Sequence, residues 1–188
     1  MILPLFRRNR RADTISALYG MIVAQARSPV FYRDYAVADT VNGRFDLLLL
    51  HVALVVSRLM CEEQGKPVAQ DLFDRFCTDM DENLREMGIG DLSVPKHMKR
   101  VGEAFYGRVQ AYEQGLAEPG DTALIQAAER NVYGGVAADA AGRLATYIRR
   151  VAGELDGLSV AEIVAGSVRF PDPALIDGRQ QAAREGWE

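Results

Sequence analysis

The sequence predicts one all-α domain of six or seven helices, followed by a non-helical C-terminal tail. Apolar residues recur at helical spacing along most of the chain, and the alternation typical of strands is nearly absent. Glycine and proline stand between the periodic segments, where helices end. A length of 188 residues fits a single domain with a sizeable core. We therefore expect a basic leader at 1–11, a compact helical domain at 12–166 and an extended or mobile tail at 167–188.

The first helix is predicted at 15–26. Asp13 or Thr14 is its expected N-cap, because short polar side chains accept hydrogen bonds from the first turn. Pro29 ends the helix, since the residue before a proline is disfavoured in helical conformation. The segment 30–35 that follows is short and aromatic, and we expect it to be extended or irregular.

The second helix, at 42–64, is apolar on nearly every side, which predicts a place in the centre of the fold. Later helices are predicted at 121–132, where Asp121 is the cap, at 136–151, and after a capping box formed by Ser159 and Glu162. Gly166 ends the last of them, and the prolines beyond it prevent further helix.

The third and fourth helices, at 68–87 and 94–116, are predicted to form a hairpin. The third helix has an apolar stripe of Val68, Leu72, Phe76, Met80, Leu84 and Met87. The fourth has a longer stripe of Val94, Met98, Val101, Phe105, Val109, Tyr112 and Leu116. Gly88 or Gly90 is the expected C-cap of the third helix, which explains the glycines without a phosphate-binding loop. Phe105 lies at the centre of its stripe, so we expect it in the core and Tyr106 on the surface.

The composition excludes several functional classes. Apolar residues make up 48% and charged residues 26% of the chain, which is ordinary for a globular protein, and the net charge of −4 does not indicate specific nucleic-acid recognition. Cys61 and Cys77 have neither metal-ligand spacing nor the numbers of a disulfide framework, so a reducing compartment is expected.

Membrane spans and export signals are also not predicted. The longest apolar run, 47–56, is about half of the ~20 residues that a membrane span needs. The apolar residues 1–6 precede Arg7, Arg8, Arg10 and Arg11, the reverse of the order in a secretory signal. We expect a cytoplasmic protein, with a peripheral position on the inner membrane as a refinement.

No catalytic or metal site is predicted. His51 lies in the most apolar helix and is interpreted as a hydrogen-bonded core residue. His97 has no orienting carboxylate nearby in sequence, and no serine or cysteine has the context of a nucleophile elbow. Asp79 and Asp81 point about 200° apart on a helix and cannot readily share an ion.

The strongest surface signal is the opposite charge of the hairpin's two helices. Lys96, Lys99 and Arg100 crowd the start of the fourth helix, where cations oppose the helix dipole. Either these cations pair with the acidic third helix, or they bind a partner. The candidate partner-binding residues are Lys96, Lys99, Arg100, Tyr106, Arg108, Asp79, Asp81 and Glu82.

Four segments resemble the ubiquinol–cytochrome c chaperone family: LYGMIVAQAR (18–27), GRFDLLLLH (43–51), LREMGIGDLSVPKHMKR (84–100) and EAFYGRVQAY (103–112). The resemblance implies a non-enzymatic helical chaperone without a cofactor, which assists biogenesis of the cytochrome bc1 complex. The implied client is cytochrome b or another bc1 subunit, and a small helper subunit accompanies mitochondrial members of the family. About eleven residues precede the family region, so a bacterial-type member without a transit peptide is expected. The basic residues Arg7, Arg8, Arg10 and Arg11 are candidates for contact with the ribosome or a membrane surface.

Two other classes remain open. One is a helical interaction module without an assembly role, and the other is an enzyme with a site around His51 or His97. Few apolar residues lie outside the helix stripes, so we expect the client to be bound through charged contacts; an apolar groove between helices would contradict this expectation.

Overall fold

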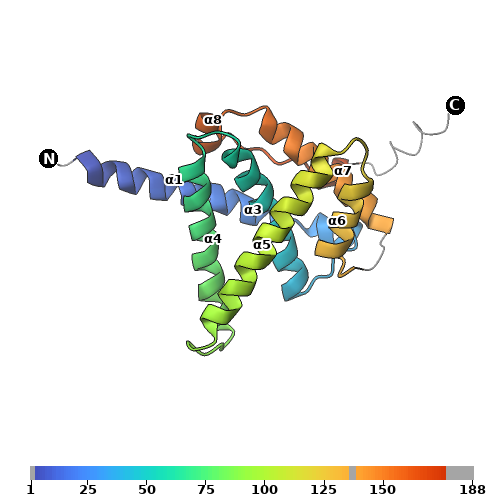
Figure 1. Ribbon diagram of the computed structural model, residues 1–188, viewed down its shortest axis with the longest axis horizontal. Coiled ribbons are helices and arrows are strands. Elements are labelled where there is room, and N and C mark those ends of the chain that lie inside the picture. Colours follow the sequence, from blue (N-terminus) through green and yellow to red (C-terminus); the bar gives the residue numbers. More distant parts are fainter. Residues whose placement is uncertain (1–2, 136–138, 177–188) are drawn as a thin grey trace.

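The computed structural model describes the backbone of residues 3–135 and 139–176 and the side chains from Arg11 onward. Within these residues the chain forms only helices and connecting turns, which confirms the all-α prediction (Figure 1). The helices are α1 (Leu3–Ala26), α2 (Pro29–Asp34), α3 (Val41–Met60), α4 (Lys66–Glu86), α5 (Val94–Ala117), α6 (Thr122–Val132), α7 (Asp139–Asp156) and α8 (Val160–Val164), with a 3-10 turn, η1 (Pro173–Leu175).

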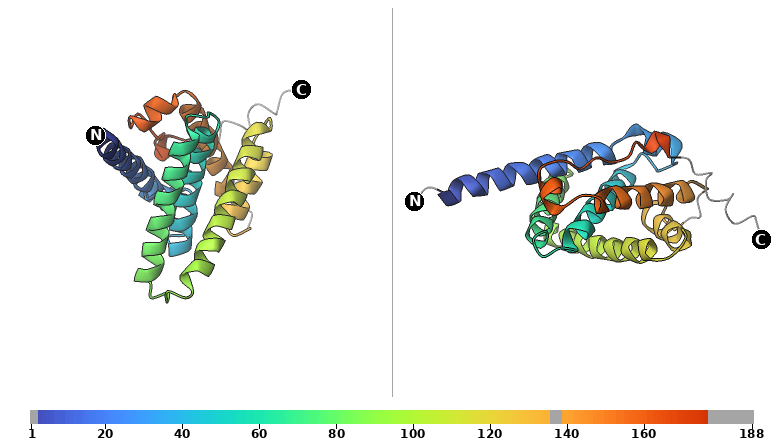
Figure 2. Two further views of the ribbon diagram at one scale, coloured as in Figure 1. Left: turned by 60° about the vertical axis from the view of Figure 1, so that its left-hand side comes forward. Right: turned by 90° about the horizontal axis from the view of Figure 1, so that it is seen from above.

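Helix α3 occupies the centre of the fold, as its sequence predicts. It packs against α1, α4, α5, α6 and α7, and every residue from Leu49 to Val56 is buried (Figures 1 and 2). Thr40 caps the helix by accepting a hydrogen bond from the Gly43 backbone N–H. A Cβ at Gly43 would lie 2.0 Å from the Ala38 carbonyl oxygen, so only glycine fits this turn.

The predicted start of the first helix is wrong. Helix α1 begins at Leu3 rather than at Asp13 or Thr14, because nothing between Pro4 and Ala26 interrupts a helix and Pro4 fits its first turn. The backbone of the basic leader is therefore the start of α1, which projects from the body (Figure 2). The side chains of Arg7, Arg8 and Arg10 lie outside the described residues.

The segment expected to be extended is helix α2. Pro29 stands in its first turn, where a missing N–H costs nothing, and Phe31 is fully buried. The aromatic residues that suggested an extended segment instead pack edge to face, with the Phe31 ring 5.3 Å from Tyr35 and 5.0 Å from Tyr147.

The expectation that the chain after Gly166 stays outside the core is wrong for residues 167–176. Val168 and Pro173 are buried, and the Tyr35 hydroxyl donates to the Pro173 carbonyl at 2.8 Å. The segment is non-helical apart from η1, as its prolines predict. The remainder of the tail, 177–188, lies outside the described residues.

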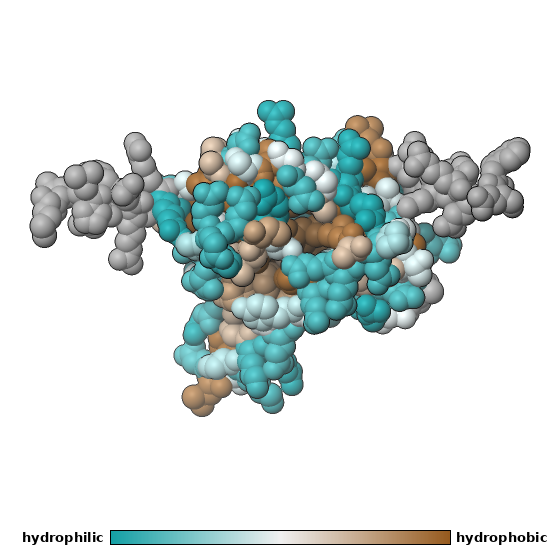
Figure 3. Space-filling model, turned by 45° about the horizontal axis from the view of Figure 1, so that its top comes forward, coloured by the Kyte–Doolittle hydropathy of each residue, from teal (hydrophilic) through white to brown (hydrophobic). Residues whose placement is uncertain are grey.

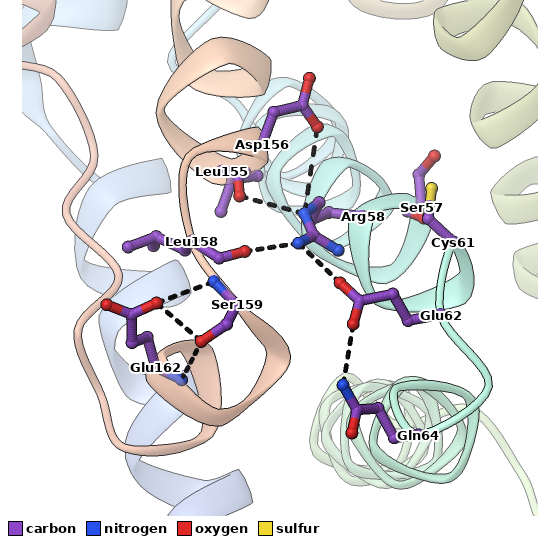
Figure 4. Close-up of polar contacts among 10 residues, drawn as sticks. All are labelled: Ser57, Arg58, Cys61, Glu62, Gln64, Leu155, Asp156, Leu158, Ser159 and Glu162. Atoms are coloured by element: carbon purple, nitrogen blue, oxygen red, sulfur yellow. Dashed lines mark hydrogen bonds and ion pairs between the residues drawn. The ribbon is translucent and has the colours of Figure 1, made fainter.

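Arginine side chains fasten the ends of several helices by donating to carbonyl groups that helices leave unpaired. Arg58 on α3 donates to the carbonyls of Leu155 and Leu158 at the end of α7 and pairs with Glu62 at 2.8 Å (Figure 4). Ser159 beside it forms the predicted capping box with Glu162.

Arg143 and Arg149 also donate to backbone carbonyls at the ends of helices and turns. Arg143 donates to the carbonyls of Asp34, Pro173 and Ile176 and lies 4.4 Å from the centre of the Tyr35 ring. Arg149 donates to the carbonyls of Gly115, Leu116 and Gly120 at the end of α5, and its pairing with Asp121 takes the carboxylate that was expected to cap α6. Arginine thus holds α2, α5, α7 and the 167–176 segment in place.

A candidate binding groove beside the α4–α5 hairpin

Helices α4 and α5 form the predicted hairpin, with α3 packed between them near their open end (Figure 2). Aromatic rings hold this end together: the ring of Phe73 on α4 lies 4.6 Å from that of Phe105 on α5. Phe105 is 2% exposed and Tyr106 is 64% exposed, as the periodicity predicts. Gly88 ends α4 with a φ of 81°, and the Ile89 N–H bonds to the Leu84 carbonyl at 3.1 Å, a C-cap that needs glycine.

Towards its tip, the hairpin is not fully covered by the rest of the fold. The stripe of α4 continues through Met80, Leu84 and Met87, but these side chains are only partly buried or exposed. They form one wall of a groove of about 330 Å³. The groove is lined by Val23, Ala26 and Arg27 of α1, Val41, Asn42, Arg44, Phe45 and Leu48 of α3, Asp79, Met80, Asn83, Leu84 and Met87 of the hairpin's first helix and its end, and Val101 of α5.

The floor of the groove is apolar and its rim is polar. Asp79 on the rim accepts a hydrogen bond from the Tyr19 hydroxyl at 2.7 Å, and burial together with this carboxylate raises the pKa of Tyr19, so the phenol remains a donor. Across the groove, Arg44 pairs with Asp39 at 2.7 Å and lies 5.7 Å from the centre of the Tyr32 ring. These contacts hold the rim side chains, while the floor offers apolar surface without a nucleophile or a paired base. Such a groove can bind an apolar segment by burying it.

Comparison with known proteins assigns the chain to a family. The family described as "Ubiquinol-cytochrome C chaperone" matches residues 33–170, well over half of the chain. The chain belongs to the ubiquinol–cytochrome c chaperone family. A crystal structure of the Cbp3 homolog from Brucella abortus is 37% identical, with a TM-score of 0.83, and the match covers 94% of this chain and 100% of that one.

Animal relatives of the family are more distant and longer. Ubiquinol-cytochrome-c reductase complex assembly factor 1 of Xenopus laevis is 25% identical over 61% of this chain, and its counterpart in Drosophila melanogaster is 26% identical over 77%. The mouse counterpart is 24% identical over 81% of this chain. The chain spans 58%, 59% and 53% of the lengths of these three relatives.

The predicted partner-binding residues of this family member do not form one surface. Asp79 lines the groove, Asp81 pairs with Arg85 at 2.7 Å and Glu82 is exposed. Lys96 and Arg100 are exposed at the start of α5, and Lys99 lies 3.7 Å from Glu103 of its own helix. In the part of the chain that the structure describes, no ion pair joins these cations to the carboxylates of α4. Of the two alternatives that the sequence left open for these cations, pairing with the carboxylates of α4 is therefore not found among the described residues.

Arg108 is a correction, because its guanidinium points into the fold. It forms an ion pair with Asp46 of α3, donates to the Asn131 carbonyl at 3.1 Å, and its side chain is only 15% exposed. Burial raises the pKa of Asp46 to about 6, although Arg108 acts to lower it. Arg108 therefore fastens α3, α5 and α6 together and is not available to a partner.

The two histidines have different environments. His51 is buried and uses both ring nitrogens: Nδ1–H donates to the Leu47 carbonyl at 2.7 Å, and Nε2 accepts from the Tyr147 hydroxyl at 2.8 Å. Gln25 donates to the same hydroxyl and to the Pro171 carbonyl, which ties α1, α3, α7 and the C-terminal segment together. The interpretation of His51 as a hydrogen-bonded core residue is confirmed. His97 is half-buried and bonds to the Ser93 carbonyl at 2.9 Å.

The described residues contain neither a metal-binding cluster nor a helix that could span a membrane. Among them, no group of three or more histidine, cysteine or acidic side chains is placed to hold a metal ion. Within the same residues, none of the helices combines the length and the apolar character needed to cross a membrane.

The apolar groove between the helices contradicts the expectation that a client is bound through charged contacts. The apolar residues of the third predicted helix were identified correctly. Their spacing does not show, however, how far along the helix the neighbouring helices cover them. Val23, Phe45 and Leu48 were missed as groove residues because they lie on helices far away in sequence. The only signal in the sequence was the continuation of the stripe to Met87, directly beside the glycine turn.

Proposed function

We propose that this chain is a non-enzymatic chaperone for assembly of the ubiquinol–cytochrome c reductase (bc1) complex, and that it holds an apolar segment of a subunit in the groove. The observation that carries the proposal is the apolar groove in a chain of the ubiquinol–cytochrome c chaperone family. Burying apolar side chains needs neither a cofactor nor a catalytic group, only a shaped surface that shields them until assembly.

The favoured client is cytochrome b, because a subunit rich in membrane spans exposes apolar helices before it is assembled. A helix laid into a groove is a recurring form of peptide recognition, with apolar residues on one face and polar residues at the edges. The rim fits this form, since Arg27 and Arg44 of α1 and α3 and Asp79 and Asn83 of α4 line the groove together with its apolar residues. These side chains would contact polar residues that flank the apolar face of the client.

Other polar residues of the hairpin are candidates for contact with a second partner. Lys99, Tyr106, Asp81 and Glu82 do not line the groove, and they suit a helper subunit that binds through polar and charged contacts. Arg7, Arg8, Arg10 and Arg11 belong to the projecting start of α1, which suits contact with the ribosome or a membrane surface. A position on the cytoplasmic face of the inner membrane would bring the groove close to newly inserted subunits.

The test is to place charge in the groove without disturbing the fold. Val41 and Met87 line opposite sides and are both exposed, so Val41→Asp with Met87→Asp should leave the fold intact. The matched control is Met60→Asp with Leu175→Asp, two exposed apolar positions outside the groove. We expect the groove variant, but not the control, to lower haem-containing cytochrome b in membranes. Equal levels of cytochrome b in both variants would contradict the proposal.

A further inference from the structure

The tip of the α4–α5 hairpin has an unusual combination of exposed apolar and basic side chains. The turn between the helices extends beyond the body of the protein, and apolar atoms lie at its far end (Figures 1 and 3). Leu92 is 99% exposed, the most exposed of the large apolar side chains that the structure describes. It does not line the groove. Ile89 in the same turn is partly exposed, so the tip presents more than an isolated apolar residue.

Basic side chains follow immediately behind this tip. Lys96 and Arg100 are exposed on the first two turns of α5, and no ion pair of either is found among the described residues. The acidic residue of the turn, Asp91, is already paired with Arg85. Cations at a helix N-terminus oppose the helix dipole, so their position is not explained by the stability of α5.

We propose that the tip of the hairpin is a membrane-docking surface, in which Leu92 enters the headgroup region of a bilayer and Lys96 and Arg100 contact anionic phospholipids. An apolar apex with cations behind it matches the two layers of a membrane surface, apolar below and anionic above. RNA would use the cations but leave Leu92 without a role, since phosphates are bound by charge. The inference goes beyond the assembly function, because it concerns lipid and does not depend on the identity of the client.

The first experiment is co-sedimentation of the full chain with vesicles of phosphatidylcholine, with and without phosphatidylglycerol. Leu92→Asp should weaken binding to the anionic vesicles by at least about tenfold, because it replaces buried apolar area with charge near an anionic surface. Leu175→Asp, which changes another exposed leucine, should bind as the parent does. The double variant Lys96→Glu with Arg100→Glu should weaken binding to the anionic vesicles by more than about tenfold. Each cation near an anionic surface contributes roughly fivefold to the affinity, and two are removed.

The charge control is Arg130→Glu with Arg169→Glu, which changes the net charge equally at two exposed positions on other parts of the fold. This variant should keep binding that is close to that of the parent. Binding that is lost in the cation variant but unchanged in Leu92→Asp would overturn the proposal in favour of a purely electrostatic surface, such as one for RNA. Binding lost only when Arg7, Arg8, Arg10 and Arg11 are all changed to glutamate would assign membrane contact to α1 instead.

A second experiment measures insertion directly. Trp187 is the one tryptophan of the chain, so Leu92→Trp in a Trp187→Phe background places a single fluorophore at the tip. Anionic vesicles should shift its emission to the blue, because the indole leaves water. Leu175→Trp in the same background should not shift. An unshifted spectrum at position 92 would overturn the proposal, and neither experiment depends on the assembly of bc1.

Discussion

The two ends of helix α5 differ in how the rest of the protein covers the same apolar stripe. At its C-terminal end, Tyr112 and Gly115 are buried, and Arg149 binds the last carbonyls of the helix. Towards its N-terminal end, Val94 is still buried, but Val101 is partly exposed and lines the groove. The same stripe therefore contributes core at Tyr112 and binding surface at Val101. The difference indicates that the candidate binding surface lies where α1 and α3 no longer cover the hairpin. Arginine contacts stabilise the covered part of the fold.

The boundary between the two ends can be tested with neighbouring residues of α5. Phe105→Ala should destabilise the protein by about 3–5 kcal/mol, the usual cost of emptying a large aromatic from a core. Tyr106→Ala should cost less than about 1 kcal/mol, because its ring is mostly exposed, with the ring centres of Phe73 and Phe105 5.8 Å and 5.6 Å away. Urea unfolding of both variants measures the difference. A reversed order would show that the covered face of α5 has been assigned incorrectly.

The stability of the protein core should also depend on pH through His51, which is buried on α3. Burial lowers the pKa of His51 from 6.5 to about 4, so between these values the unfolded chain binds a proton that the folded chain does not. Stability from this residue is present above the unfolded pKa and is lost as the pH falls through this window, by about 3 kcal/mol in total. Asp46, whose pKa is raised by burial to about 6, contributes a slope of the opposite sign in nearly the same window.

The two effects are separated by comparison with His51→Gln, which keeps Asp46. The stability of the parent minus that of the variant should decrease as the pH is lowered from 7 towards 4, in unfolding experiments at each pH. A difference that does not change with pH would mean that burial does not hold His51 neutral in the folded protein.

A smaller loss is expected from the arginine contacts. Arg143→Met should destabilise the protein by about 2 kcal/mol, because three carbonyl groups lose a charged donor. Arg33→Met is the matched control, since Arg33 is exposed and pairs only with its neighbour Asp34, and it should cost less than about 0.5 kcal/mol. Thermal unfolding of both variants compares them. Similar melting temperatures would remove the role of Arg143 in holding the C-terminal segment.

The smallest effect on stability is expected from the exposed cations near the N-terminal end of α5. Changing Lys96, Lys99 and Arg100 together to glutamate should leave stability unchanged or raise it slightly, because acidic side chains suit a helix N-terminus by roughly 0.3–1 kcal/mol each. The pair of Lys99 with Glu103 is exposed and i,i+4, so its loss is minor. A clear drop in melting temperature would show that these cations stabilise the hairpin after all.

The sequence was sufficient for the parts of the fold set by local patterns. The spacing of apolar residues predicted α3 at the centre and Phe105 in the core, and the capping box of Ser159 with Glu162 was found from two residues. Helix α2 was missed because its stability comes from packing of Phe31 against α7, which no local pattern records. The C-terminal segment was missed for the same reason, since Pro173 is held by Tyr35 far away in sequence.

The candidate site could be predicted only in part. The charges of the hairpin were visible in the sequence, but their partners were not: Arg108 looked like a surface cation until Asp46 was placed beside it. The groove depends on where α1 and α3 end relative to α4, a property of the tertiary arrangement. Stripe periodicity identifies residues that avoid water and leaves open whether the protein or a partner covers them.

The central claim is that the groove holds an apolar segment of a bc1 subunit, and photocrosslinking in membranes tests it most directly. A photoreactive p-benzoylphenylalanine would replace Leu84 in the groove or, as a control, the exposed Leu175 on η1. Irradiation of cells that are assembling the complex should give an adduct with cytochrome b from position 84 and none from position 175. An equal yield of that adduct from both positions, or no bc1 subunit bound at position 84, would contradict the account.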